Sequence, residues 1–144
     1  MATARSGAIL FVEDNVEDFV IAHRQLRDCN VSNPVRCVPT AHHLTRYLEG
    51  SGDYADRDLY PLPAVIVMDL RLPEVDGLQA QAWVRSKLKF RKIPIIAISS
   101  EEQVKVLRSA VTLGADAFLL KPFKAREFFH LAEQKNLPVD YKRA

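Results

Sequence analysis

The sequence has no apolar run close to the roughly 20 residues that a membrane-spanning helix needs, and its N-terminus lacks the apolar core of a signal peptide. Its two cysteines match no metal-binding spacing. We therefore expect Cys29 and Cys37 to be reduced thiols in a cytoplasmic protein with no membrane association. The net charge of +2 is too small to indicate binding to nucleic acid.

The length of 144 residues is that of one domain, in which short apolar runs alternate with helical periods. We expect a disordered lead-in at 1–7, a domain at 8–136 and a C-terminal tail at 137–144. The expected strands are Ala8–Val12, Val35–Pro39, Ala64–Met68, Pro94–Ile98 and Ala117–Leu120. The expected helices cover residues 16–28, 41–49, 77–89, 101–113 and 124–135. No role can be assigned to the longer connection at 50–63.

A strand followed by a helix, repeated five times, predicts an α/β fold with a five-stranded parallel sheet covered by helices on both faces. Right-handed crossovers favour the doubly wound, flavodoxin-like strand order 2-1-3-4-5. In that order the first and third strands are neighbours where the winding reverses. Such sheets bind their ligands in the crevice at that point.

Charged residues follow the strands whose carboxyl ends meet at this crevice. Glu13 and Asp14 come after the first strand, Asp69 after the third and Lys121 after the fifth. Carboxylates held together need protons or a cation, and an all-oxygen set favours Mg²⁺. A metal there neutralises an incoming phosphoryl group, an Asp carboxylate can be the nucleophile, and a lysine can pair with the product. The alternative, in which the acids only cap helices or form turns, suits Asp14 alone but not the whole set.

Four motifs carry a resemblance to a known family. They are Glu13-Asp14, Met68-Asp69 with Leu72-Pro73 and Asp76-Gly77, the run Ile95 to Ser100, and the run Gly114 to Phe123. Each motif alone is weak. Together, in this order and at these separations, they resemble the receiver domain of two-component response regulators from about Ala8 to Ala132.

The resemblance implies a role for each matching residue. Asp69 would accept a phosphoryl group from the phosphohistidine of a sensor histidine kinase. Ser99 would hydrogen-bond to that phosphoryl group, and Lys121 would pair with it. The protein ligands of Mg²⁺ would be Glu13, Asp14, Asp69 and the backbone carbonyl of Arg71.

The resemblance also implies a conformational switch. Phosphorylation adds about two negative charges at Asp69, Ser99 and Lys121 move toward them, and Phe118 fills the space that is vacated. The result is a population shift of the face formed by the fourth helix, fifth strand and fifth helix. The Lys121-Pro122 peptide bond would be cis. As a receiver, the protein would catalyse its own phosphorylation and dephosphorylation without an output enzyme domain.

Two further expectations concern residues around the site. Arg71 and Glu101 follow Asp69 and Ser99 by two positions, so we expect a salt bridge that hinders water and tunes the acyl-phosphate lifetime. The alternative is two solvated side chains.

The fourth helix should bury one face, formed by Val104, Leu107 and Val111. Its opposite face should be a homodimer interface or carry singly exposed apolar residues, and its members are Val106, Ala110 and Leu113.

We therefore expect a stand-alone receiver that signals through protein partners. The sequence is also similar to stand-alone regulators paired with bacteriophytochrome kinases, so such a kinase is the expected partner. Two alternatives share the site: a phosphorelay intermediate, and a phosphorylation-independent binding module, although such modules typically lose part of the acid–Ser–Lys set. A dinucleotide-binding domain would need a glycine-rich turn where Glu13 and Asp14 stand. An aspartate-nucleophile phosphatase would need a second Asp where Arg71 stands.

Overall fold

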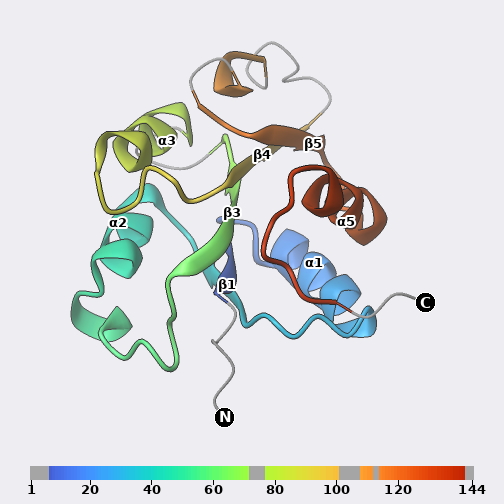
Figure 1. Cartoon of the computed structure of the whole chain (residues 1–144), viewed down its shortest axis with the longest axis horizontal. Helices are drawn as coiled ribbons and strands as arrows, with labels where there is room; N and C mark the ends of the chain where they lie inside the picture. The colour runs from blue at the N-terminus through green and yellow to red at the C-terminus, as the bar shows by residue number, and fades with distance from the viewer. Residues whose placement is uncertain (1–6, 72–76, 101–107, 112–113, 142–144) are drawn as a thin grey trace.

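A five-stranded parallel sheet with helices on both faces forms the centre of the protein in the computed structural model (Figure 1). The structure describes residues 7–71, 77–100, 108–111 and 114–141. The elements are β1 (Ala8–Val12), α1 (Val16–Asp28), β2 (Val35–Val38), α2 (Ala41–Glu49), the 3-10 helix η1 (Gly52–Tyr54), β3 (Pro63–Asp69), α3 (Gly77–Ser86), β4 (Ile95–Ser99), β5 (Ala117–Leu120) and α5 (Ala125–Gln134). The strand order is β2-β1-β3-β4-β5, so the predicted doubly wound fold is confirmed.

The three central strands are buried along their whole length, as expected for a parallel sheet covered on both faces. Every residue of β1, β3 and β4 is buried. β1 lies between β2 and β3, with Val12 beside Val38 on one side and Met68 on the other. Because Glu13 and Asp69 come directly after Val12 and Met68, the two acids emerge from neighbouring strands at the same edge of the sheet.

Two apolar cores hold the helices to the sheet, one on each face. α2 and α3 cover one face, where Leu44 and Val84 pack with Leu10 and Ile66. α1 and α5 lie together on the other face (Figure 1), where Leu26 and Phe128 belong to the core. Burying one large apolar side chain stabilises a fold by about 1.5–3 kcal/mol, so these layers keep the edge of the sheet in place.

Two expectations from what the sequence lacks can be compared with the structure. Cys29 and Cys37 are both free thiols, and burial raises the pKa of Cys37 to about 12, so this thiol stays protonated at neutral pH. Within the described ranges, no helix combines the length and the apolar character required to cross a bilayer.

The connection at residues 50–63 closes the C-terminal end of α2. Arg57 folds back over this end and donates hydrogen bonds to the carbonyl oxygens of Tyr47 (2.8 Å), Leu48 (2.7 Å) and Tyr60 (3.1 Å). The last carbonyl groups of a helix lack partners within the helix, and a cation there is favourable. The connection therefore has a structural role that its composition did not indicate.

Asn33 ties the two end segments of the described chain together. Its Nδ2 donates to the carbonyl oxygens of Gly7 (2.8 Å) and Pro138 (3.0 Å), and its Oδ1 accepts from the N–H of Asp140 (2.6 Å). The Asn33 side chain is buried, and a buried amide with its polar atoms paired holds its neighbours in place. Residues 137–141, expected to be part of a tail, thus lie against the domain.

The two faces of the fourth expected helix were assigned wrongly where the structure can test them. Ala110, expected at an exposed interface, is completely buried, and its carbonyl oxygen accepts a hydrogen bond from Gln81 Nε2 at 2.7 Å. Val111, expected in the core, is 41% exposed. Both faces of this helix are apolar, so hydropathy alone could not identify the buried one. Val106 and Leu113 lie outside the described residues.

Candidate functional site

The site lies at the carboxyl edge of the sheet, where β1, β3, β4 and β5 end. Glu13 directly follows β1, Asp69 ends β3 beside Ile98 of β4, and Lys121 directly follows β5. The backbone N–H of Lys121 donates to the carbonyl oxygen of Ser99 at 2.8 Å, which fixes the end of β5 against β4. The expected cis peptide bond follows, between Lys121 and Pro122.

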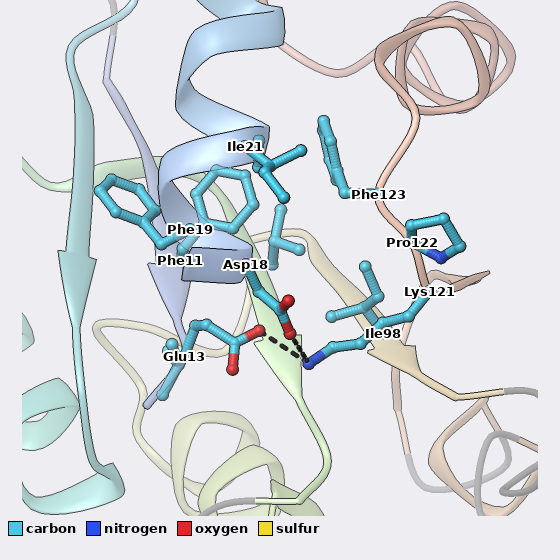
Figure 2. A pocket seen from close by; sticks show the side chains of 12 residues that line it. Phe11, Glu13, Asp18, Phe19, Ile21, Ile98, Lys121, Pro122 and Phe123 are labelled. Atoms are coloured by element: carbon cyan, nitrogen blue, oxygen red, sulfur yellow. Dashed lines mark hydrogen bonds and ion pairs between the residues drawn. The ribbon is translucent and has the colours of Figure 1, made fainter. Parts of the chain in front are cut away.

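The ammonium group of Lys121 contacts three carboxylates. Its Nζ lies 2.8 Å from Asp69 Oδ2, 2.9 Å from Glu13 Oε1 and 2.9 Å from Asp18 Oδ2. Figure 2 shows the contacts with Glu13 and Asp18 as dashed lines. A lysine ammonium has three N–H donors, so each donor has a partner. Lys121 therefore compensates only part of the negative charge that these carboxylates bring together.

An acidic cluster beside Lys121 has the composition of a site for a hard cation. One carboxylate oxygen from each of Glu13, Asp14 and Asp69 can be chosen so that all lie within 4.8 Å of one another. Glu13 and Asp69 are buried and Asp14 is exposed. Mg²⁺ prefers oxygen ligands and keeps several waters, so two buried acids and one exposed acid suit it. The structure thus brings together the three carboxylates that were predicted as metal ligands.

The backbone after β3 also faces this cluster. The N–H of Arg71 donates to Asp69 Oδ1 at 2.8 Å, so the two oxygens of Asp69 have different partners. The Arg71 carbonyl as a metal ligand stays a prediction. Glu101, the expected partner of the Arg71 side chain, lies outside the described residues.

Two ionisable groups of the site have pKa values far from their usual ones. Burial and a hydrogen bond to Asp69 raise the pKa of Glu13 from 4.5 to about 7, although the hydrogen bond to Lys121 lowers it. Burial lowers the pKa of Lys121, but its hydrogen bonds to Asp69, Glu13 and Asp18 outweigh that effect and raise it. Lys121 is therefore charged at neutral pH, whereas Glu13 loses its proton only near neutrality.

The Ser99 hydroxyl is buried at the end of β4. Ser99 is 1% exposed, and its Oγ has no hydrogen-bond partner within the part of the chain that the structure describes. Buried hydroxyl groups are normally paired. An unpaired hydroxyl one strand away from Asp69 is therefore available to a ligand that carries oxygen atoms.

Phe118, the expected switch residue, lies at the surface in this structure. It pairs with Ala97 of β4 across the strand ladder and is 42% exposed. The position agrees with an outward side chain next to the site. Whether it changes rotamer stays a prediction.

Asp18 is the site residue that the sequence reasoning missed. It lies in the first turn of α1, where an acid is common because its negative charge interacts favourably with the helix dipole. Because this explanation accounts for an acid here, the sequence did not indicate its contact with Lys121, which lies 103 positions further along the chain.

Comparisons with known proteins agree with this geometry. The family model for the response regulator receiver domain matches residues 9–133. The solved structure of the bacteriophytochrome response regulator AtBRR is 33% identical and has a TM-score of 0.80, with 98% of this chain and 99% of that chain covered. The receiver domain of the sensor histidine kinase PA1611 from Pseudomonas aeruginosa, which has a magnesium ion coordinated in its active site cleft, is 27% identical. Its TM-score is 0.71, with 90% of this chain and 96% of that chain covered.

A curated relative also aligns with most of the chain. The probable methanogenesis regulatory protein FilR2 of Methanothrix harundinacea is 25% identical over 129 residues, which cover 88% of this chain and 79% of that protein. The family model matches most of the chain, and the acids, serine and lysine stand together at one edge of the sheet. The chain belongs to the response regulator receiver domain family.

Proposed function

We propose that Asp69 accepts a phosphoryl group from the phosphohistidine of a sensor histidine kinase, with Mg²⁺ as the cofactor. The 2.8 Å contact between Lys121 Nζ and Asp69 Oδ2 carries this proposal, because it holds a positive charge on the carboxylate that becomes the acyl phosphate. An oxygen of Asp69 attacks the phosphorus, the phosphorus–nitrogen bond breaks, and the released imidazole takes up a proton.

Glu13, Asp14 and Asp69 would hold the Mg²⁺, with the Arg71 carbonyl as a further ligand. The oxygen cluster at the edge of the sheet supports this assignment, as does the magnesium ion in the cleft of the PA1611 receiver domain. When bound, the ion neutralises charge on the phosphoryl oxygens.

Ser99 and Phe118 would convert phosphorylation into a change of shape. The Ser99 hydroxyl would donate to a phosphoryl oxygen, since it is buried beside the site and has no partner among the described residues. Phe118, which is exposed on the neighbouring strand, would turn inward as Ser99 moves. The surface of β5 and α5 would then differ between the two states.

The kinase would dock on α1, beside the phosphorylation site. Val16, Val20 and Ile21 are exposed on this helix, and Val16 is 73% exposed. Ile21 also lines an apolar pocket of about 300 Å³ whose other walls include Phe19 and Phe123 and whose polar rim includes Lys121 (Figure 2). Exposed apolar side chains next to a polar site are typical of a docking surface. The similarity to AtBRR supports a bacteriophytochrome kinase as this partner.

The face of β5 and α5 would form a homodimer interface in the cytoplasm. Phe118 and Leu120 are exposed on β5, and they line a surface hollow together with His130 and Leu131 of α5. Sedimentation with and without a phosphoryl analogue tests this interface. A strict monomer in both conditions would contradict it.

The acceptor assignment is tested with Mg²⁺ and acetyl phosphate, a small phosphodonor, followed by mass spectrometry of the intact protein. Wild type should gain one phosphoryl group, and Asp69→Asn should gain none. Asp53→Asn, which changes an exposed acid in η1, is the matched control and should behave as wild type. Equal labelling of Asp69→Asn would overturn the assignment.

The phosphorelay alternative uses the same residues and differs only in the partner. Transfer of the label from phosphorylated protein to a histidine phosphotransfer protein would identify it. A binding module that needs no phosphate would instead remain unlabelled. The complete set of Asp69, Ser99 and Lys121 at one edge supports phosphorylation over this last alternative.

A further inference from the structure

Asp18 contacts Lys121 without being a member of the acidic cluster. Two of the three carboxylates around Lys121 Nζ, those of Glu13 and Asp69, belong to the candidate metal site. The third, Asp18, comes from the first turn of α1, and its side chain is 43% exposed. Its Oδ2 lies 2.9 Å from Lys121 Nζ, the same distance as the nearest oxygen of Glu13.

Separate contacts hold both partners of this ion pair in place. Asn15 Oδ1 accepts a hydrogen bond from the backbone N–H of Asp18 at 3.0 Å, which fixes the first turn of α1. On the same helix, Gln25 Nε2 donates to the carbonyl oxygen of Phe123 at 2.9 Å, and Gln25 Oε1 accepts from the N–H of Ala125 at 2.7 Å. α1 is thereby clamped to the segment that follows Lys121. The pair is thus part of a rigid arrangement, unlike most exposed ion pairs.

The three donors of Lys121 are shared among three acceptors, and phosphorylation must redistribute them. A phosphoryl group on Asp69 needs at least one of these donors, and Glu13 is a candidate metal ligand. Asp18 neither accepts the phosphoryl group nor belongs to the candidate metal site. It is therefore the carboxylate that competes with the phosphoryl group for the ammonium. Its partly exposed negative charge also repels an anionic phosphodonor that approaches Lys121.

We propose that Asp18 is a positioning residue that holds the Lys121 ammonium on the α1 side of the site and thereby restrains phosphorylation of Asp69. This inference rests on the proposed function. Competition for the ammonium and repulsion of the donor act in the same direction, so losing the Asp18 charge speeds phosphorylation. The size of the effect is about two- to fivefold, as expected for a partly exposed ion pair.

Three variants test the inference through the initial rate of phosphorylation by acetyl phosphate with Mg²⁺. Asp18→Asn keeps the shape and removes the charge, so its rate should rise about two- to fivefold. Asp18→Glu restores the charge and should return the rate to that of wild type. Glu17→Gln is the matched control, because it removes the same charge from an exposed neighbour in the same helical turn. Its rate should stay at the wild-type value. Equal rates in Asp18→Asn and Glu17→Gln would overturn the inference.

A second measurement is independent of phosphorylation. Urea unfolding without metal, for wild type, Asp18→Asn, Lys121→Gln and the double variant, gives the coupling between the two side chains. The expected coupling is about two- to fivefold in the unfolding equilibrium constant, and its absence would show that Asp18 does not hold Lys121. If the wild type is labelled on Asp69 but the Asp18 variants behave as the control, this inference alone fails. If neither wild type nor any variant is labelled, the proposed function fails together with this inference.

Discussion

Replacing Glu13 by Gln should remove a pH dependence from the stability of the protein. Burial and the hydrogen bond to Asp69 raise the pKa of Glu13 from 4.5 to about 7. Between these two values the folded state retains a proton that the unfolded state has released. The free energy of unfolding therefore falls as the pH rises through this window. The stability that protonated Glu13 contributes is fully present only at pH values below the window.

The two pKa values also set the size of the effect. One pKa unit corresponds to about 1.4 kcal/mol, so the loss between the two ends of the window is at most about 3 kcal/mol. Gln has the shape of a protonated Glu and cannot ionise. The Glu13→Gln variant should therefore match wild type at about pH 4.5 and exceed its stability by up to about 3 kcal/mol at about pH 8.

Urea unfolding at a series of pH values, followed by the fluorescence of Trp83, measures this difference. Trp83 is the one tryptophan of the chain and packs against Phe90. Glu17→Gln serves as the control for the loss of an exposed acid. Added Mg²⁺ should flatten the wild-type curve, because a bound cation favours the ionised carboxylate. Parallel curves for wild type and Glu13→Gln across the whole pH range would refute the reasoning.

Three further substitutions have expected effects on stability that unfolding in urea can measure. Asn33→Ala removes three hydrogen bonds from a buried amide and should cost about 2–4 kcal/mol, whereas exposed Gln134→Ala should cost less than about 0.5 kcal/mol. Phe118→Ala should cost less than about 1 kcal/mol because this residue is 42% exposed, whereas Phe128→Ala in the core should cost about 3–5 kcal/mol. Equal costs would contradict the exposed position of Phe118. Gly77→Ala would place a Cβ 2.5 Å from the Cα of the residue after Asp69, so it should lower stability by about 1–3 kcal/mol and also slow phosphorylation. A neutral Gly77→Ala would show that this backbone can move freely.

The position of the site could be predicted because it follows from local pattern and topology. Each central strand is a continuous apolar run, so its end is visible in the sequence where Glu13 or Asp69 follows. The alternation of strands and helices then favours an order in which the ends of the first and third strands are neighbours. The pairing of Lys121 with Asp69 was implied by the resemblance to receiver domains, because β4 lies between β3 and β5.

Features that depend on the rotation of a helix could not be predicted in the same way. Ala110 and Val111 are adjacent apolar residues, and which one is buried depends on how the helix packs, for example on the bond from Gln81. Asp18 raises the same difficulty, because its direction depends on where Asn15 begins α1. Both require the rotation of a helix about its axis, which residue type alone does not determine.

The bridge formed by Asn33 has a practical consequence for protein engineering. Since one amide nitrogen bonds to the carbonyl groups of both Gly7 and Pro138, a short linker between these two positions could close the backbone into a ring. New termini could then be opened in an exposed connection elsewhere. Gly7 precedes β1 whereas Glu13 follows it, so a sensor or reporter fused beside this bridge would stand at the far end of the strand from Glu13 and leave the acidic edge of the sheet accessible.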